Sequence, residues 1–224
     1  MTITEYLEKK FGFVVEKELG SGFYGVAYLL KDGRVLKITK DKSEAVVANK
    51  IVGKEFEHIA NIYKVGSIKT ETDRIFYWIL LEYVPYNGDN SFISKFLKVV
   101  FTAYKEITGD LPDDGMEEHI ADDAALNSEI YEYIKTNYNG NQKLLDTFYQ
   151  YTVMLSEVFT INQAYPDTHF GNIGFKPNGN LCIFDLMGDD YDTDSLSHYS
   201  MNENKAKKLI ITENQMDIIL KAIS

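Results

Sequence analysis

The first third of the chain alternates short apolar runs with turn sequences, and few folds accommodate that pattern. Two strand-like runs flank a glycine-rich turn in GFVVEKELGSGFYGVAYLL, and a third run, VLKIT, follows the KDGR segment. An Asp-Gly pair between apolar runs is typical of a tight β-hairpin. The runs IYKVGSI and IFYWILLEYV predict two more strands. The sequence therefore predicts a small antiparallel sheet of five strands.

The period of the apolar residues changes between the third and the fourth predicted strand. The segment SEAVVANKIVG places its small and apolar residues on one helical stripe. Ser43 is the expected N-cap of this helix, and Gly53 is its expected end. The predicted order of elements over residues 1–84 is β-β-β-α-β-β.

After residue 84 the pattern becomes helical. The run SFISKFLKVVFTAYKEI repeats its apolar residues with a period close to that of an α-helix. We therefore predict an α+β chain with a β-rich N-lobe over residues 1–84 and a helical C-lobe over residues 85–224. The predicted helices cover residues 91–107, 116–137, 142–163 and 213–223, and Thr212 is the expected cap of the last one.

The net charge of −11 is distributed unevenly along the chain. Residues 1–84 carry 13 basic and 12 acidic side chains, whereas residues 85–224 carry 10 and 22. This distribution excludes broad nucleic-acid binding, which requires a basic face. Nine acidic residues lie between Asp110 and Glu132 without a lysine or arginine. We interpret them as a solvated helix face with its loop; the alternative is a docking patch for a basic protein.

Cysteine usage and hydropathy indicate in which cellular compartment the protein is expected. The single cysteine, Cys182, lies in the apolar run LCIF and predicts a buried free thiol rather than a disulfide. No stretch approaches the roughly 18 apolar residues of a membrane span, and the N-terminus lacks the apolar region of a signal peptide. These features predict a cytoplasmic protein that does not associate with membranes.

The glycine-rich turn is the first of four motifs that carry chemistry. Gly20, Gly22 and Gly25 form a G-x-G-x-x-G pattern, in which backbone N–H groups can approach phosphates without hindrance from Cβ atoms. A strand follows the pattern here, whereas a helix follows it in dinucleotide-binding folds. This context favours a β-hairpin that covers phosphates; the alternative is a plain glycine-rich hairpin.

The second motif is Lys37, which lies between apolar neighbours in the run RVLKI. An unpaired buried ammonium is costly, so this side chain requires a polar partner such as phosphate oxygens or a helix carboxylate. Glu44, on the predicted helix, is the expected carboxylate, with Glu55 and Glu57 as alternatives. If the strand lies at an edge, Lys37 faces solvent instead.

The third and fourth motifs are DTHFGN and DLMG, joined by the run IGFKPNGNLCIF. That run predicts two strands and an N-G turn, which would bring Asn172 and Asp185 close together. Phosphoryl transfer uses such residue types: one carboxylate, here Asp167, orients or deprotonates the acceptor hydroxyl. An amide oxygen and a second carboxylate suit Mg²⁺, which prefers oxygen ligands.

In this order, the four motifs resemble those of the protein-kinase-like superfamily, from about Gly20 to Gly188. GSGFYGVA is similar to the glycine-rich loop, VLK to the lysine motif of the third strand, and LEYV to the hinge segment. DTHFGN is similar to the catalytic loop, and DLMG to the metal-binding DFG element. The resemblance implies a bilobal kinase fold with a reduced helical C-lobe, and binding of ATP and Mg²⁺.

The resemblance also implies roles for individual residues. It implies Asp167 as the catalytic base and Asn172 and Asp185 as magnesium ligands, with His169 either structural or facing the acceptor. It further implies that the glycine-rich loop, which ends at Ala27, covers the nucleotide, and that Lys37 contacts the α- and β-phosphates. The backbone of Glu82 and Val84 is expected to bind adenine.

Three departures from ordinary protein kinases qualify the resemblance. Tyr165 and Pro166 precede Asp167 in place of the His-Arg pair, and the D-x-H-x-x-N spacing is similar to that of aminoglycoside phosphotransferases and small atypical kinases. No Ala-Pro-Glu motif follows Asp185, so we expect a minimal C-lobe. Compact kinase-like proteins of tailed phages are similar in these respects, and the segment KKLIITENQMDIILKAI resembles one found on phage proteins.

These features together predict an ATP-dependent kinase, phage-encoded and active in the host cytoplasm, whose acceptor is a Ser or Thr hydroxyl of a protein. The acidic C-lobe would suit a basic acceptor protein. Two alternatives stay open at this point. One is a pseudokinase that binds nucleotide or a partner without transfer, and the other is a small-molecule kinase of the aminoglycoside type.

Overall fold

The computed structural model describes residues 8–22, 24–70, 75–85, 92–110, 115–162, 166, 168–186 and 209–211. The described residues form two compact units. The first unit contains residues 8–55 and 61–83 with the short strand at 209–211, and the second contains residues 56–60 and 84–186. The two units interleave along the sequence, because residues 56–60 group with the second one.

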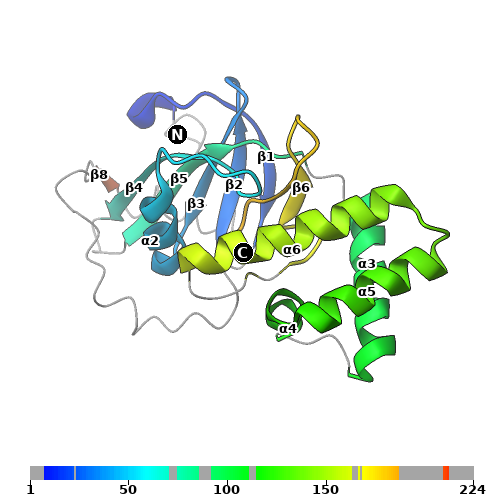
Figure 1. Ribbon diagram of the computed structural model, residues 1–224. Coiled ribbons are helices and arrows are strands. Elements are labelled where there is room, and N and C mark those ends of the chain that lie inside the picture. The colour runs from blue at the N-terminus through cyan, green and yellow to red at the C-terminus, as the bar shows by residue number, and fades with distance from the viewer. Residues whose placement is uncertain are drawn as a thin grey trace. The chain divides into compact units, whose positions relative to one another are not determined.

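The first unit is built on a six-stranded sheet in the order β1-β2-β3-β5-β4-β8 (Figure 1). The first five strands pair antiparallel, as predicted, whereas β8 pairs parallel with the edge strand β4. The sequence analysis did not anticipate β8, which is only three residues long. The strands are β1 (Val15–Ser21), β2 (Gly25–Leu30), β3 (Arg34–Thr39), β4 (Ile62–Thr70), β5 (Ile75–Glu82) and β8 (Leu209–Ile211).

One helix, α2 (Lys42–Ile51), lies between β3 and β4 in the sequence and packs against β3, β4 and β5. Its N-cap is Asp41 rather than the predicted Ser43, because the Asp41 carboxylate accepts hydrogen bonds from the backbone N–H groups of Ser43 and Glu44. Gly53 has a φ of +73°, which favours glycine just beyond a helix end.

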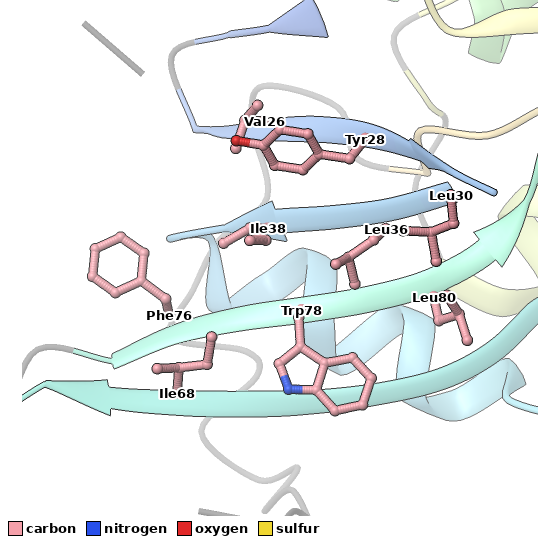
Figure 2. Packing of buried hydrophobic residues seen from close by; sticks show 9 residues of the cluster. All are labelled: Val26, Tyr28, Leu30, Leu36, Ile38, Ile68, Phe76, Trp78 and Leu80. Carbon is pink, nitrogen blue, oxygen red and sulfur yellow. The ribbon is translucent and has the colours of Figure 1, made fainter. Parts of the chain in front are cut away.

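One apolar cluster of the first unit, the Trp78 cluster, lies on one face of the sheet (Figure 2). Trp78 occupies its centre, and the rings of Phe11 and Phe13 meet the Trp78 ring edge to face at 5.5 and 5.7 Å. Gly66 lies opposite Trp78 in the register of β4 and β5, and a Cβ atom there would collide with the indole ring. The buried cluster consists of Val26, Tyr28, Leu30, Leu36, Ile38, Ile68, Phe76, Trp78 and Leu80.

The second unit consists of helices and one hairpin. Helices α3, α5 and α6 pack on one another, and α4 contacts both α5 and α6. The predicted helix over residues 116–137 is divided in two, because the Asp123 side chain accepts from the backbone N–H groups of Ala125 and Leu126 and so starts a new helix. The elements are α3 (Phe92–Thr108), α4 (Met116–Asp122), α5 (Ala124–Asn137), α6 (Gln142–Asn162), β6 (Ile173–Phe175) and β7 (Leu181–Ile183).

The predicted fold class is confirmed: the chain is α+β, and its described residues form a β-rich first part followed by a largely helical part. Cys182 is a buried free cysteine, as expected. The predicted helix over residues 213–223, with its cap Thr212, lies outside the described residues. Across the part of the chain that the structure describes, no helix is both long and apolar enough to span a membrane.

Tyr28 supplies a test of the core. Its hydroxyl is buried without a hydrogen-bond partner among the described residues, and burial, together with the Glu18 carboxylate, raises the pKa of Tyr28 to about 12. We predict that Tyr28→Phe increases the free energy of unfolding at pH 7 by about 1 kcal/mol, because it removes an unpaired buried polar group. Urea denaturation measures this difference.

The same variant has a predicted pH dependence. The pKa of Tyr28 is higher in the folded protein than in the unfolded chain. The free energy of unfolding of the wild type is therefore unaffected by this group below about pH 10 and falls between pH 10 and pH 12, where the phenol ionises more readily in the unfolded chain. The stability advantage of Tyr28→Phe over the wild type should therefore grow across that interval. A difference that stays constant from pH 9 to pH 12 would show that the phenol is solvated.

Candidate functional site

The first unit contains a buried ion pair between β3 and α2. The ammonium Nζ of Lys37 lies 2.5 Å from Oε1 of Glu44, and the two side chains are only 19% and 10% exposed. Glu44 is thus a partner of Lys37, in preference to the alternatives Glu55 and Glu57, which follow the end of α2 and are exposed.

The strand register explains the position of Lys37. Lys37 lies opposite Ala27 on β2 and opposite Ile79 on β5, so the three side chains share one face of the sheet. This face is the one opposite the Trp78 cluster, because side chains alternate along β3. Ala27 has the smallest of these three side chains, and α2 supplies the carboxylate.

The three glycines of the turn between β1 and β2 differ in their surroundings. A Cβ atom at Gly25 would collide with the backbone oxygen of Ile38, so the pairing of β2 with β3 itself requires glycine there. At Gly20 and Gly22 a Cβ atom would meet no described residue within 4 Å. Packing among the described residues therefore explains why residue 25 is a glycine. It leaves open space at Gly20 and Gly22. Such space suits a phosphate group approached by backbone N–H groups.

The predicted adenine-binding residues lie at the end of β5. Glu82 is held by Asn61: its backbone N–H donates to the Asn61 carbonyl at 2.9 Å, and its carboxylate accepts from the Asn61 N–H at 3.1 Å. Val84 is 5% exposed, and its backbone makes no hydrogen bond within the described part of the chain. A backbone N–H group without a partner is uncommon in a buried residue. Such a group can donate a hydrogen bond to an acceptor atom of a ligand.

In the second unit, the β6–β7 hairpin brings the two predicted metal ligands together. Strands β6 and β7 pair from Ile173 with Ile183, and the next backbone bond runs from the Phe184 N–H to the Asn172 carbonyl at 3.0 Å. Asn172 and Asp185 therefore both lie at the open end of the hairpin. Their amide and carboxylate oxygens are a donor set that fits Mg²⁺. The turn at the other end contains Gly179, with a φ of +90°.

Residues 56–60 hold this hairpin in place, which the sequence did not reveal. Ile59 forms a parallel bridge with Ile183, and backbone bonds run from the Ile183 N–H to the His58 carbonyl and from the Ala60 N–H to the Ile183 carbonyl. The His58 ring donates from Nδ1 to the Leu181 carbonyl at 2.8 Å. His58 is 4% exposed, so it is part of the packed interior.

The loop between α6 and β6 is described at residue 166 and from residue 168 onward, and Asp167 lies outside the described residues. Nδ1 of His169 accepts a hydrogen bond from the Gly171 N–H at 2.9 Å, and the His169 carbonyl accepts from the Asn172 N–H at 2.9 Å. His169 thus closes a tight turn that leads to Asn172. Its ring has a structural function in that turn, one of the two roles we expected.

The acidic segment from residue 110 to 132 is largely solvated, with one exception. Its described members, such as Glu118 and Asp122, are exposed, as expected for a helix face in solvent. Glu117 is 8% exposed and its carboxylate contacts the hydroxyl of Thr168. A run of acidic residues in a sequence contains no signal that singles out the one that points inward.

Comparison with known proteins gives limited similarity. No family model matches the chain, and no curated protein matches it. Among solved structures, the chain is similar to a MAP kinase from Leishmania major, with 13% sequence identity and a TM-score of 0.42. The match covers 83% of this chain and 50% of the other, so the chain spans about half the length of that kinase. A similarity of this extent identifies neither a family nor an activity.

The contrast between the glycines gives a testable prediction. Gly25→Ala should lower the free energy of unfolding by about 2 kcal/mol, because the methyl group collides with the backbone of β3. Gly22→Ala should change it by less than about 0.5 kcal/mol; if this turn covers the phosphates of ATP, as the sequence predicts, the same variant should weaken ATP binding about tenfold, the equivalent of about 1.4 kcal/mol. Denaturation and calorimetric titration measure the two quantities. Equal stability losses in both variants would contradict this division of roles.

Proposed function

We propose that the protein is an ATP- and Mg²⁺-dependent phosphotransferase that transfers the γ-phosphoryl group to a hydroxyl acceptor. The observation that carries the proposal is the buried pair of Lys37 and Glu44. A buried ion pair is a poor source of stability, because desolvation of both charges offsets most of their attraction. Its presence on a largely buried face of the sheet is understandable if the ammonium group also has a ligand to bind.

In this proposal, residues of the first unit bind the nucleotide. Lys37, held by Glu44 and only partly exposed, contacts the α- and β-phosphates. The backbone N–H groups around Gly20 and Gly22 approach the phosphates from the β1–β2 turn. Ala27, the residue opposite Lys37 on β2, has a small side chain.

At the end of β5, we propose that the backbone of Glu82 and of Val84 binds adenine. The buried and unpaired amide of Val84 supports this assignment.

Residues of the second unit supply the metal ligands and the base. Asn172 and Asp185, adjacent at the end of the hairpin, would hold Mg²⁺ through their oxygen atoms. When bound, the ion offsets the negative charge of the phosphates. Asp167 accepts the proton of the acceptor hydroxyl, and a fixed carboxylate there also orients that hydroxyl for attack. His169 accepts a hydrogen bond from the Gly171 N–H. This bond holds the tight turn that leads to Asn172.

We propose a Ser or Thr side chain of a protein as the acceptor. Residues 85–224 carry 22 acidic and 10 basic side chains, and the described acidic residues of α4 and α5 are mostly exposed. Such a surface attracts basic segments of a partner. We further propose that the protein is phage-encoded and acts in the host cytoplasm, which rests on the sequence resemblance alone.

The test is transfer of label from γ-labelled ATP with Mg²⁺ into a phosphatase-treated bacterial lysate and, separately, into a panel of aminoglycosides. We expect acid-stable label on Ser or Thr of lysate proteins. Asp167→Ala should reduce transfer at least a hundredfold while preserving ATP binding, because it removes the base alone. Asp185→Ala should weaken the magnesium-dependent part of ATP binding as well.

The matched control is Asp146→Ala, which removes an exposed carboxylate on α6 and should leave transfer unchanged. Label on aminoglycosides alone would replace the protein acceptor with a small molecule. ATP binding without transfer to any acceptor, and without ATP hydrolysis, would identify a pseudokinase and refute the proposed activity.

A further inference from the structure

Three buried side chains form a chain of hydrogen bonds in the second unit. The Tyr151 hydroxyl, on α6, lies 2.7 Å from Oγ1 of Thr168, and that oxygen is also hydrogen-bonded to Oε1 of Glu117, on α4. Tyr151, Thr168 and Glu117 are 0%, 2% and 8% exposed. From the sequence we expected Glu117 to lie on a solvated helix face, and we predicted no role for Tyr151 or Thr168.

The chemistry of the three groups fixes the direction of the bonds. The Thr168 hydroxyl donates to the carboxyl group of Glu117. The Thr168 oxygen then accepts from the Tyr151 hydroxyl. Both bonding functions of Thr168 are thereby used, which holds its side chain in one rotamer between two helices.

Glu117 is an expensive residue at this position. A buried carboxyl group loses its hydration, and the hydrogen bonds that it makes return only part of that free energy. Its neighbour on α4, Glu118, is exposed at no such cost. Helix α4 is itself fixed to α3, because the Tyr104 hydroxyl lies 2.7 Å from Nδ1 of His119. Glu117 is therefore a buried anchor on a fixed helix, and it is hydrogen-bonded to Thr168 of the loop.

Thr168 begins the described turn that ends at Asn172. Immediately after it, His169 accepts hydrogen bonds from the N–H groups of both Gly171 and Asn172. Immediately before it in the sequence is Asp167, and Cα atoms of adjacent residues are about 3.8 Å apart. A rotation of Thr168 about its backbone is therefore transmitted to both neighbours within one residue.

We propose that Glu117 is a positioning residue for the loop at residues 168–172, acting through Thr168 with Tyr151 as the second support. This inference rests on the proposed function, because the loop it positions carries the proposed metal ligand Asn172 and follows the proposed base. Glu117, acting through Thr168, affects the rate of phosphoryl transfer and does not affect nucleotide binding in the first unit.

The first test compares two buried threonines. Thr168→Val keeps the shape of the side chain but removes the hydroxyl, and it should lower kcat about a hundredfold with KM for ATP changed less than twofold, since small misplacements of reacting groups cost about that much. Thr147→Val is the matched control: its hydroxyl, also buried, bonds only the Lys143 carbonyl within α6. It should leave kcat within twofold of the wild type.

The second test reads the loop directly and requires no activity. In Thr168→Val, hydrogen exchange of the Asn172 amide should accelerate at least tenfold, because the turn that protects it loses its anchor. The Gly179 amide, bonded to the Lys176 carbonyl in the hairpin turn, should exchange at the wild-type rate. Equal acceleration at both amides would mean general destabilisation and would overturn the proposal.

A third pair of variants covers the case in which Thr168→Val does not fold. Glu117→Gln replaces the buried carboxyl group with an amide that still has an acceptor oxygen, and it should lower kcat about tenfold, whereas the exposed control Glu118→Gln should have no effect. Thr168→Ser, which retains the hydroxyl, should keep kcat within about threefold of the wild type. An active wild type whose kcat is unchanged by Glu117→Gln and Thr168→Val would overturn the positioning role alone. A wild type without transfer would overturn the proposed function, and the positioning role with it.

Discussion

The ion pair of Lys37 and Glu44 is the constraint that orders the first unit. It fixes the rotation of α2 on the sheet, because any other helical face would leave a buried ammonium group without a carboxylate. It also requires the observed register of β3, since a slip by one residue would turn Lys37 into the Trp78 cluster on the opposite face. The apolar cluster can then be continuous on one face, while the other face contains a charged group.

In the second unit, buried polar side chains hold particular segments of the backbone in defined positions. His58 bonds the hairpin at Leu181, and residues 56–60 add a parallel bridge to β7. Glu117 and Tyr151 hold the loop at Thr168. These contacts converge on the two segments that end in Asn172 and Asp185. Apolar packing alone would stabilise the helices without fixing those segments so closely.

Local signals in the sequence predicted much of this structure, and tertiary contacts account for what was missed. The Asp-Gly turn, the helical periods and the N-G hairpin were sufficient to locate most elements. The break at Asp123 was missed because a capping aspartate within an acidic run resembles its neighbours. The burial of His58 and of Glu117 depends on partners 123 and 51 residues away, Leu181 and Thr168, and no spacing rule connects them. Lys37 could be recognised as a candidate site residue because a charged side chain between apolar neighbours requires a polar partner.

We propose that the first unit binds ATP through the ammonium group of Lys37, which Glu44 holds. Thermal unfolding of the wild type with and without ATP and Mg²⁺ tests it most directly, because a ligand of the folded state stabilises by about 2.7 kcal/mol at a hundred times its Kd. The account predicts a rise of several degrees in Tm with millimolar ATP and Mg²⁺, and loss of that rise in Lys37→Met. An unchanged Tm of the wild type, or an equal rise in Lys37→Met, would contradict it.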